Sequence, residues 1–125
     1  MMTKVLVVDD SNVMRKVIIR ELTKLGIEPS NITEAANGQE ACDQVAAGKF
    51  DLILMDWNMP VMLGIDAVKQ IRASGNKTPI CMVTSEAEKS NVVLAIQSGA
   101  NNYLVKPFVA ESFQEKLAQL LAIPH

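Results

Sequence analysis

The chain has 125 residues, of which 49% are hydrophobic and 21% charged, and this composition is typical of one folded domain with its own core. Its formal net charge of −2, without a basic run, argues against nucleic-acid binding, which needs a clustered positive surface. Two cysteines outside any CxxC motif and a single histidine, His125, exclude a recognisable zinc site and disfavour a disulfide framework.

In chain order, five short apolar runs predict strands at residues 5–8, 31–35, 52–55, 80–83 and 103–105. Most lack polar alternation, which is typical of strands buried on both faces, whereas residues 31–35 are less apolar and are expected at an edge. The first run is too short for a signal peptide or a membrane span. We therefore expect a cytoplasmic protein without membrane insertion.

Between these runs, apolar residues recur at helical spacing, as in Met14, Ile18 and Leu22. Two segments, Asn37 to Glu40 and Ser85 to Glu88, resemble N-caps with a glutamate three residues on. Four glycines are expected to end helices in the left-handed conformation: Gly26, Gly48, Gly75 and Gly99. The strict alternation predicts an α/β fold of (βα)5 type, a parallel sheet covered by helices on both sides, in one domain over residues 1–125.

In an open parallel sheet, ligands bind beyond the carboxyl ends of the strands, so the residues that follow each run are the informative ones. They are Asp9 and Asp10, then Ala36 and Asn37, then Asp56, then Thr84 and Ser85, and finally Lys106 before Pro107. Three carboxylates, a hydroxyl group and an ammonium group are therefore expected at one edge of the sheet.

Three ionised carboxylates in one crevice repel each other, by about 4 kcal/mol for two charges roughly 4 Å apart at an effective dielectric constant near 20. Either some of them are protonated or a cation lies among them. Mg²⁺ prefers oxygen ligands and binds through one or two carboxylates, water and phosphate oxygens. Asp56, which stands alone after the central run, is the best nucleophile for forming an aspartyl-phosphate, with Lys106 neutralising phosphoryl oxygens.

The ordered set of Asp9-Asp10, Asp56, Thr84 and Lys106-Pro107-Phe108 resembles the receiver domains of two-component response regulators over the whole chain. Residues 56–60, with the sequence DWNMP, resemble the CheY-like single-domain chemotaxis receivers in particular. The resemblance implies a doubly wound, flavodoxin-like five-stranded parallel sheet with strand order 2-1-3-4-5.

The resemblance also implies a role for each residue at the site. Asp56 would accept the phosphoryl group from a histidine kinase or a histidine phosphotransfer protein. Asp10 and Asp56 would ligate Mg²⁺ directly, Asn58 through its backbone carbonyl group and Asp9 through water. Lys106 would pair with a phosphoryl oxygen, and its peptide bond to Pro107 would be cis.

Two further residues would form a switch. Thr84 would bind a phosphoryl oxygen, and Tyr103 would turn inward as Thr84 moves. The surface formed by the fourth helix, fifth strand and fifth helix would then change and bind an output protein such as a flagellar motor switch component. The protein would be a monomer and would catalyse its own phosphorylation and dephosphorylation without being a turnover enzyme.

One position departs from the family pattern. Receivers usually have Asp or Asn before the glycine of the third loop, and here Leu63 precedes Gly64. Such a residue would cap the third helix, and its loss costs about 1 kcal/mol. Leu63 also joins Val61 and Met62 in an apolar cluster that either contacts a partner or packs against the domain.

Several alternatives remain open. Asp9 to Ser11 also fit a helix cap before Asn12, and Thr84 and Ser85 are expected to start a helix whatever else they do. The basic residues of the first helix, Arg15, Lys16, Arg20 and Lys24, predict a solvated face. The functional alternatives are a phosphorelay intermediate, a structural interaction module with a vestigial site and a hydrolase of external phosphoesters, which Asn58 disfavours because it cannot act as a general acid.

Overall fold

The computed structural model describes residues 3–121, so His125 lies outside the described residues. Five parallel strands form one sheet in the order β2-β1-β3-β4-β5, which confirms the predicted fold class and strand order. The elements in chain order are β1 (Val5–Val8), α1 (Asn12–Lys24), a 3-10 turn (Pro29–Asn31), β2 (Ile32–Ala35), α2 (Gly38–Ala47), β3 (Leu52–Met55), α3 (Gly64–Ala73), β4 (Ile80–Thr84), α4 (Lys89–Ser98), β5 (Asn102–Val105) and α5 (Ala110–Leu121).

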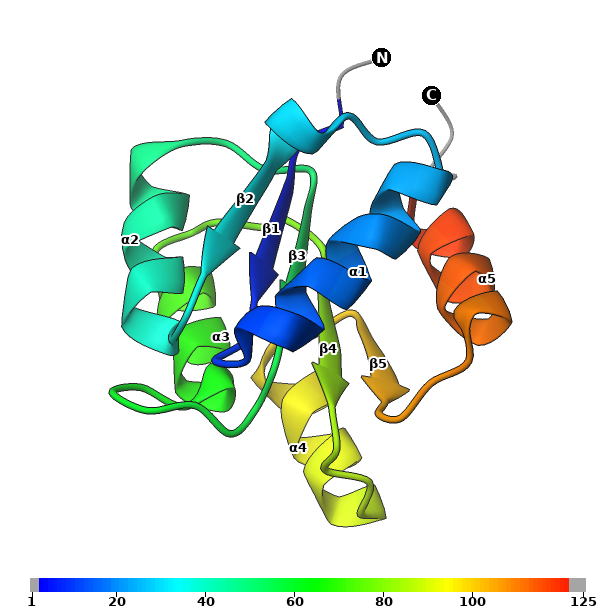
Figure 1. Cartoon of the computed structure of the whole chain (residues 1–125). Coiled ribbons are helices and arrows are strands. Elements are labelled where there is room, and N and C mark those ends of the chain that lie inside the picture. The colour runs from blue at the N-terminus through cyan, green and yellow to red at the C-terminus, as the bar shows by residue number, and fades with distance from the viewer. Residues whose placement is uncertain (1–2, 122–125) are drawn as a thin grey trace.

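Alternate residues of each strand face opposite sides of the sheet, and helices cover both sides (Figure 1). Val5 and Val7 of β1 pack on the side of α1 and α5, with Phe113 of α5 fully buried among them. Leu6 and Val8 pack on the other side, beneath α2, α3 and α4. Each fully buried Leu or Phe contributes about 1.5–3 kcal/mol through removal of apolar surface from water, so this two-sided core holds the strand ends in fixed positions.

Two helix starts follow the sequence closely. The Ser11 hydroxyl group accepts a hydrogen bond from the Met14 amide at 3.1 Å, so Ser11 caps α1. The Asn37 side chain accepts one from the Glu40 amide at 2.8 Å and caps α2 as predicted. Both caps lie directly after strands and fix how the chain leaves the carboxyl end of the sheet.

Two predictions about helix ends are wrong. Ser85 does not start a helix, because α4 begins at Lys89 and is preceded by Glu88 without a side-chain cap. The glutamate between them, Glu86, instead bonds to residues outside this turn, as described below. Gly48 follows α2 in an extended conformation with φ −151°, whereas Gly26, Gly75 and Gly99 have the predicted positive φ.

The carboxyl ends of β1, β3, β4 and β5 meet along one edge of the sheet because the strands are parallel and adjacent. Val8 pairs with Met55 across β1 and β3, so the residues that follow them become neighbours. Among residues 3–121, none of the helices combines the length and the apolar character needed to cross a bilayer.

Candidate functional site

The three aspartates predicted at the sheet edge form a cluster. One carboxylate oxygen from each of Asp9, Asp10 and Asp56 lies within 4.8 Å of the others. Asp9 and Asp56 are buried and Asp10 is exposed, so the cluster opens to solvent on one side. The convergence follows from the register of β1 and β3 and confirms the predicted juxtaposition.

Lys106 enters this cluster from the end of β5. Its Nζ atom lies 2.9 Å from Asp9 Oδ2 and 3.4 Å from Asp56 Oδ2. Burial alone would lower the pKa of Lys106, but the hydrogen bond to Asp9 and the charge of Asp56 outweigh it, and the pKa is raised. Lys106 is therefore a fixed ammonium group, followed by a cis peptide bond to Pro107 as the family resemblance implies.

The environment of Asp56 indicates that the ammonium group of Lys106 does not fully compensate the negative charge of the carboxylates. Burial raises the pKa of Asp56, the charge of Asp9 raises it further, and Lys106 lowers it only in part. The Trp57 amide also donates to Asp56 Oδ1 at 2.8 Å. The site therefore favours a further positive charge, and its three carboxylates are oxygen donors of the kind that Mg²⁺ binds.

The loop after Asp56 packs tightly against the phosphoacceptor candidate. The Gly64 amide donates to Trp57 O at 2.8 Å, and a Cβ atom on Gly64 would lie 1.8 Å from Asp56 O. A side chain at position 64 would therefore displace the backbone of Asp56. Glycine is required here by the close approach of two backbone segments.

A second network starts at Thr84, which is fully buried at the end of β4. The Glu86 amide donates to the Thr84 hydroxyl oxygen at 3.3 Å, and the Tyr103 hydroxyl group donates to Glu86 O at 2.6 Å. The two carboxylate oxygens of Glu86 accept from Asn58 at 3.0 Å and from Asn91 of α4 at 3.1 Å. Glu86 thus connects the loop after β3, the loop after β4, α4 and β5.

A family model described as a response regulator receiver domain matches residues 5–118, nearly all of the chain. The chain belongs to the response regulator receiver family. This assignment agrees with the sheet order and with the acidic cluster beside a lysine.

Individual relatives of this receiver agree with the family model. The chemotaxis protein CheY1 of Helicobacter pylori is 44% identical over 121 residues, covering 94% of this chain and 96% of that protein. The chemotaxis protein CheY-3 of Vibrio cholerae is 41% identical over 119 residues, covering 94% and 90%. A solved structure of the Vibrio cholerae chemotaxis protein CheY4 superposes with a TM-score of 0.86 at 37% identity, covering 96% of this chain and 99% of that one.

The receiver brings the predicted site residues together in two groups. Asp9, Asp10, Asp56 and Lys106 share the acidic cluster. Thr84, Tyr103 and Asn58 are each hydrogen-bonded to Glu86, and the side chain of Thr84 also bonds to Asp56, which links the two groups. Tyr103 is buried with 9% exposure, so its ring already lies inward in this structure.

Sequence patterns missed two residues beside the site. Arg15, predicted on a solvated face, bonds to Glu34, Asn12 and the backbone oxygen of Asp9, and only 14% of its side chain is exposed. That prediction is wrong for Arg15, whereas Lys16 and Arg20 are exposed. Asn91 was missed because nothing in the sequence links it to Glu86. The position of Arg15 in the first turn of α1, four residues after the Ser11 cap, could have indicated that its side chain lies near the turn after β1.

The apolar cluster of the third loop is divided. Met62 packs against the core, and its backbone oxygen accepts from the Gly38 amide at 3.2 Å. Val61 and Leu63 remain 80% and 40% exposed, and Val61 has φ +70°, which is strained for a β-branched residue. Leu63 precedes α3 without a side-chain cap, as its apolar nature predicts.

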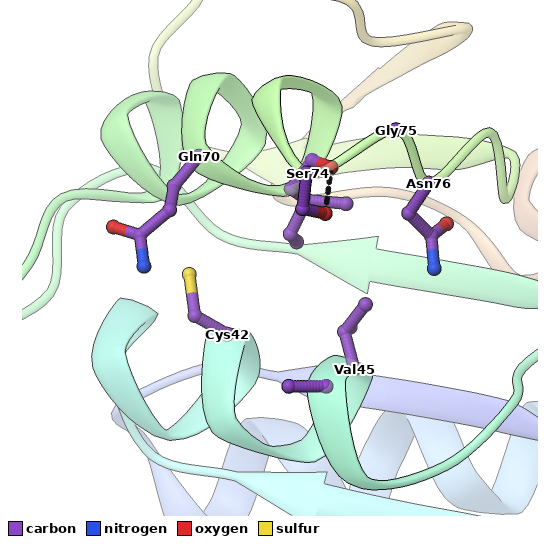
Figure 2. Close-up of a pocket in the computed structure, with 8 residues that line it drawn as sticks. Cys42, Val45, Gln70, Ser74, Gly75 and Asn76 are labelled. Atoms are coloured by element: carbon purple, nitrogen blue, oxygen red, sulfur yellow. Dashed lines mark hydrogen bonds between the residues drawn. The ribbon is translucent and has the colours of Figure 1, made fainter.

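A separate hollow of about 440 Å³ lies between α2 and α3, and Figure 2 shows the Cys42 thiol and Gln70 beside it. It is lined by Cys42, Val45, Ala46, Gln70, Ile71, Ser74, Gly75 and Asn76, none of which belongs to the acidic cluster. Burial, with the charge of Asp43, raises the pKa of Cys42, so the thiol is a poor nucleophile. The reactive groups of this receiver therefore lie at the sheet edge and not in this hollow.

Proposed function

We propose that this receiver is a phosphorylation-dependent signalling switch that accepts a phosphoryl group on Asp56 from a phosphohistidine of a kinase or a histidine phosphotransfer protein. The observation that carries this proposal is the imbalance of charge at the sheet edge, where three carboxylates lie beside a single ammonium group that contacts two of them. Such a site favours a divalent cation and then an anionic phosphoryl group next to the lysine.

In the proposed reaction, an Asp56 carboxylate oxygen attacks the phosphorus atom as the phosphorus–nitrogen bond to the donor histidine breaks. Asp10, Asp56 and the backbone carbonyl group of Asn58 would hold Mg²⁺, with Asp9 acting through water. The metal ion, when bound, neutralises charge on the phosphoryl oxygens. Lys106 pairs with another of these oxygens, and its raised pKa keeps it protonated throughout.

The response to phosphorylation is proposed to pass through Thr84 to Tyr103. The Thr84 hydroxyl group would bind a phosphoryl oxygen, and its bond to the Glu86 amide would change. Glu86 O accepts from Tyr103, so a shift of this loop moves the tyrosine. Exposed apolar side chains lie on the proposed output surface of α4, β5 and α5, namely Val93, Leu94, Ile96 and Val105.

We further propose that the output is chemotaxis and that the partner is a flagellar motor switch component. Support comes from the two relatives named as chemotaxis proteins, at 44% and 41% identity. The receiver unit would span residues 1–125 and act as a cytoplasmic monomer. It would hydrolyse its own aspartyl-phosphate, with Asn58 and Glu86 beside the phosphoryl group, and would not turn over external substrates.

The test of the phosphoacceptor is incubation of the protein with Mg²⁺ and acetyl phosphate, followed by reduction of the acyl phosphate with borohydride and peptide mass spectrometry. We expect modification at Asp56, dependence on Mg²⁺ and no modification in Asp56→Asn. Phosphate on another residue, or equal labelling of the variant, would overturn the proposal.

A second assay separates a motor switch output from a phosphorelay. The phosphorylated protein is mixed with peptides of a flagellar motor switch component and, separately, with a histidine phosphotransfer domain. We expect peptide binding that depends on phosphorylation. Loss of phosphate to the phosphotransfer domain without peptide binding would favour the relay instead.

A further inference from the structure

Arg15 on α1 connects three parts of the molecule next to the acidic cluster. Its Nε atom donates to Glu34 Oε1 of β2 at 2.8 Å, and Nη2 donates to Asn12 Oδ1 at 3.3 Å. Its Nη1 atom donates to the backbone oxygen of Asp9. The guanidinium group thus ties the turn after β1 to β2 and to the first turn of α1.

Every polar group of Asp9 is bonded within this arrangement. Its amide donates to Ala35 O at 3.1 Å, Oδ1 accepts from the Ser11 amide at 2.8 Å and Oδ2 accepts from Lys106 at 2.9 Å. Arg15 supplies the remaining bond, to the backbone oxygen. Asp10 follows with an exposed side chain, so the position of its carboxylate depends on the backbone of this turn.

We infer that Arg15 is a positioning residue for divalent cation binding, acting through the backbone of Asp9 to hold the Asp9-Asp10 turn in the geometry of the metal site. This inference rests on the proposed function, because it concerns the same metal ion. Outer residues that orient metal ligands typically change metal affinity by about 10- to 100-fold when they are lost.

The positioning role and the charge of Arg15 have opposite effects on cation binding. A positive charge beside the site repels Mg²⁺, so an effect of charge alone predicts tighter binding when Arg15 is removed. A positioning role predicts weaker binding. Arg15→Lys sharpens the distinction because it keeps the charge but lacks the planar fork that reaches three acceptors.

The experiment is a Mg²⁺ titration of the native protein and its variants. Binding is monitored through the fluorescence of Trp57, whose amide bonds to Asp56. We expect Arg15→Ala and Arg15→Lys both to raise the Kd for Mg²⁺ about tenfold. Lys16→Ala, which removes an exposed positive charge from the same helix, is the matched control and should leave Kd within about twofold. Equal affinity of native protein and Arg15→Lys, or tighter binding by Arg15→Ala, would overturn the inference.

A readout without metal accompanies the titration. Hydrogen exchange of the Ser11 amide, which bonds to Asp9 Oδ1, should be faster in both Arg15 variants, while amides of β3 and β4 keep their native protection. Uniformly faster exchange across the sheet would mean a general loss of stability and would overturn a positioning role. Native protein that binds no Mg²⁺ would overturn the proposed function and this inference together, whereas native binding with unaltered Arg15 variants overturns the inference alone.

Discussion

The two edges of the sheet each contain a half-buried cation, and the two cations have different partners. At the carboxyl edge, Lys106 faces Asp9 and Asp56 in a cluster that also holds Asp10, and burial and repulsion raise the pKa of Asp56. At the amino edge, Arg72 of α3 donates to neutral oxygens, with no carboxylate among its hydrogen-bond partners within residues 3–121.

The bonds of Arg72 join three segments. Its guanidinium group donates to Gly99 O at 3.0 Å, Asn76 O at 3.0 Å and Asn101 Oδ1 at 2.8 Å. Asn101 Oδ1 also accepts from the Ile80 amide at 2.9 Å, which fixes the start of β4. Arg72 at the amino edge is thus bonded to neutral groups of the protein, whereas the carboxyl edge gathers three carboxylates around Lys106.

The difference extends to the loops. The carboxyl edge contains the strained Val61, and both α3 and α4 begin there without a side-chain cap. The amino edge contains Gly75 and Gly99, whose positive φ suits glycine. Strain and unbalanced charge therefore gather at the edge where we propose phosphorylation, as expected where function competes with stability.

The largest effect is expected at the carboxyl edge from Gly64→Ala, because the new Cβ atom meets the Asp56 backbone oxygen at 1.8 Å. We expect a loss of about 4 kcal/mol in the free energy of unfolding, measured by urea denaturation. Gly48→Ala is the matched control, since its nearest atom lies at 3.9 Å and its φ of −151° suits alanine. Similar stability of the two variants would contradict the close packing described for the third loop.

The next test exchanges the two cations for methionine. Lys106→Met leaves Asp9, which is 1% exposed, without its ion pair and should cost about 3 kcal/mol in Mg²⁺-free buffer. Added Mg²⁺ should recover part of this loss. Arg72→Met should cost about 2 kcal/mol whether or not Mg²⁺ is present, because its lost bonds are to neutral oxygens. Equal responses of the two variants to Mg²⁺ would remove the contrast between the edges.

Asp56→Asn should stabilise the metal-free protein, and the gain in the free energy of unfolding should increase with pH. The pKa of Asp56 is raised above its ordinary value of 3.8, so the stability that its proton provides is present below pH 3.8 and lost as pH rises through the raised pKa. The amide keeps this stability, and we expect a gain of about 1 kcal/mol at pH 7 that disappears near pH 3.8. Thermal unfolding at several pH values measures this gain, with Asp43→Asn, at an exposed position, as the control. A gain that does not depend on pH would contradict the burial of Asp56 and its repulsion by Asp9.

The smallest effects are expected in the third loop. Leu63→Asn supplies the missing cap of α3, and Val61→Asn places a residue that tolerates positive φ at φ +70°. Each should raise the free energy of unfolding by about 1 kcal/mol. Val13→Asn, at an exposed apolar position inside α1 where valine and asparagine have similar helix propensity, should change stability by less than about 0.5 kcal/mol. If neither loop variant is stabilising, the missing cap at Leu63 and the positive φ of Val61 do not lower the stability of the protein.

The sequence predicted the sheet and the acidic cluster because both depend on short-range patterns. Runs such as residues 52–55 are apolar on both faces, and the residue after each run must lie at the carboxyl edge of a parallel sheet. Asp9, Asp56 and Lys106 therefore came together from strand alternation, although they are far apart in the chain.

Hydrogen bonds to distant segments account for two of the wrong predictions, those for Ser85 and Arg15. Ser85 and Glu88 have the spacing of a helix cap, but Glu86 between them bonds to Asn58 and Asn91, and the helix starts later. Arg15 has the helical position of a solvated residue, yet Glu34 and the Asp9 backbone hold it against the turn after β1. Such bonds join segments whose proximity appears only after folding.

We propose that Lys106 alone does not balance the three carboxylates of the carboxyl edge and that a divalent cation binds there, and thermal unfolding at pH 7 with increasing Mg²⁺ tests this most directly. A cation that binds only the folded state raises the midpoint as its concentration exceeds Kd. We predict that Mg²⁺ stabilises the native protein by about 1–2 kcal/mol, which raises its midpoint temperature by several degrees. The midpoint temperature of Asp56→Asn should rise much less. Equal midpoint shifts for the two proteins, or none for the native protein, would contradict the account.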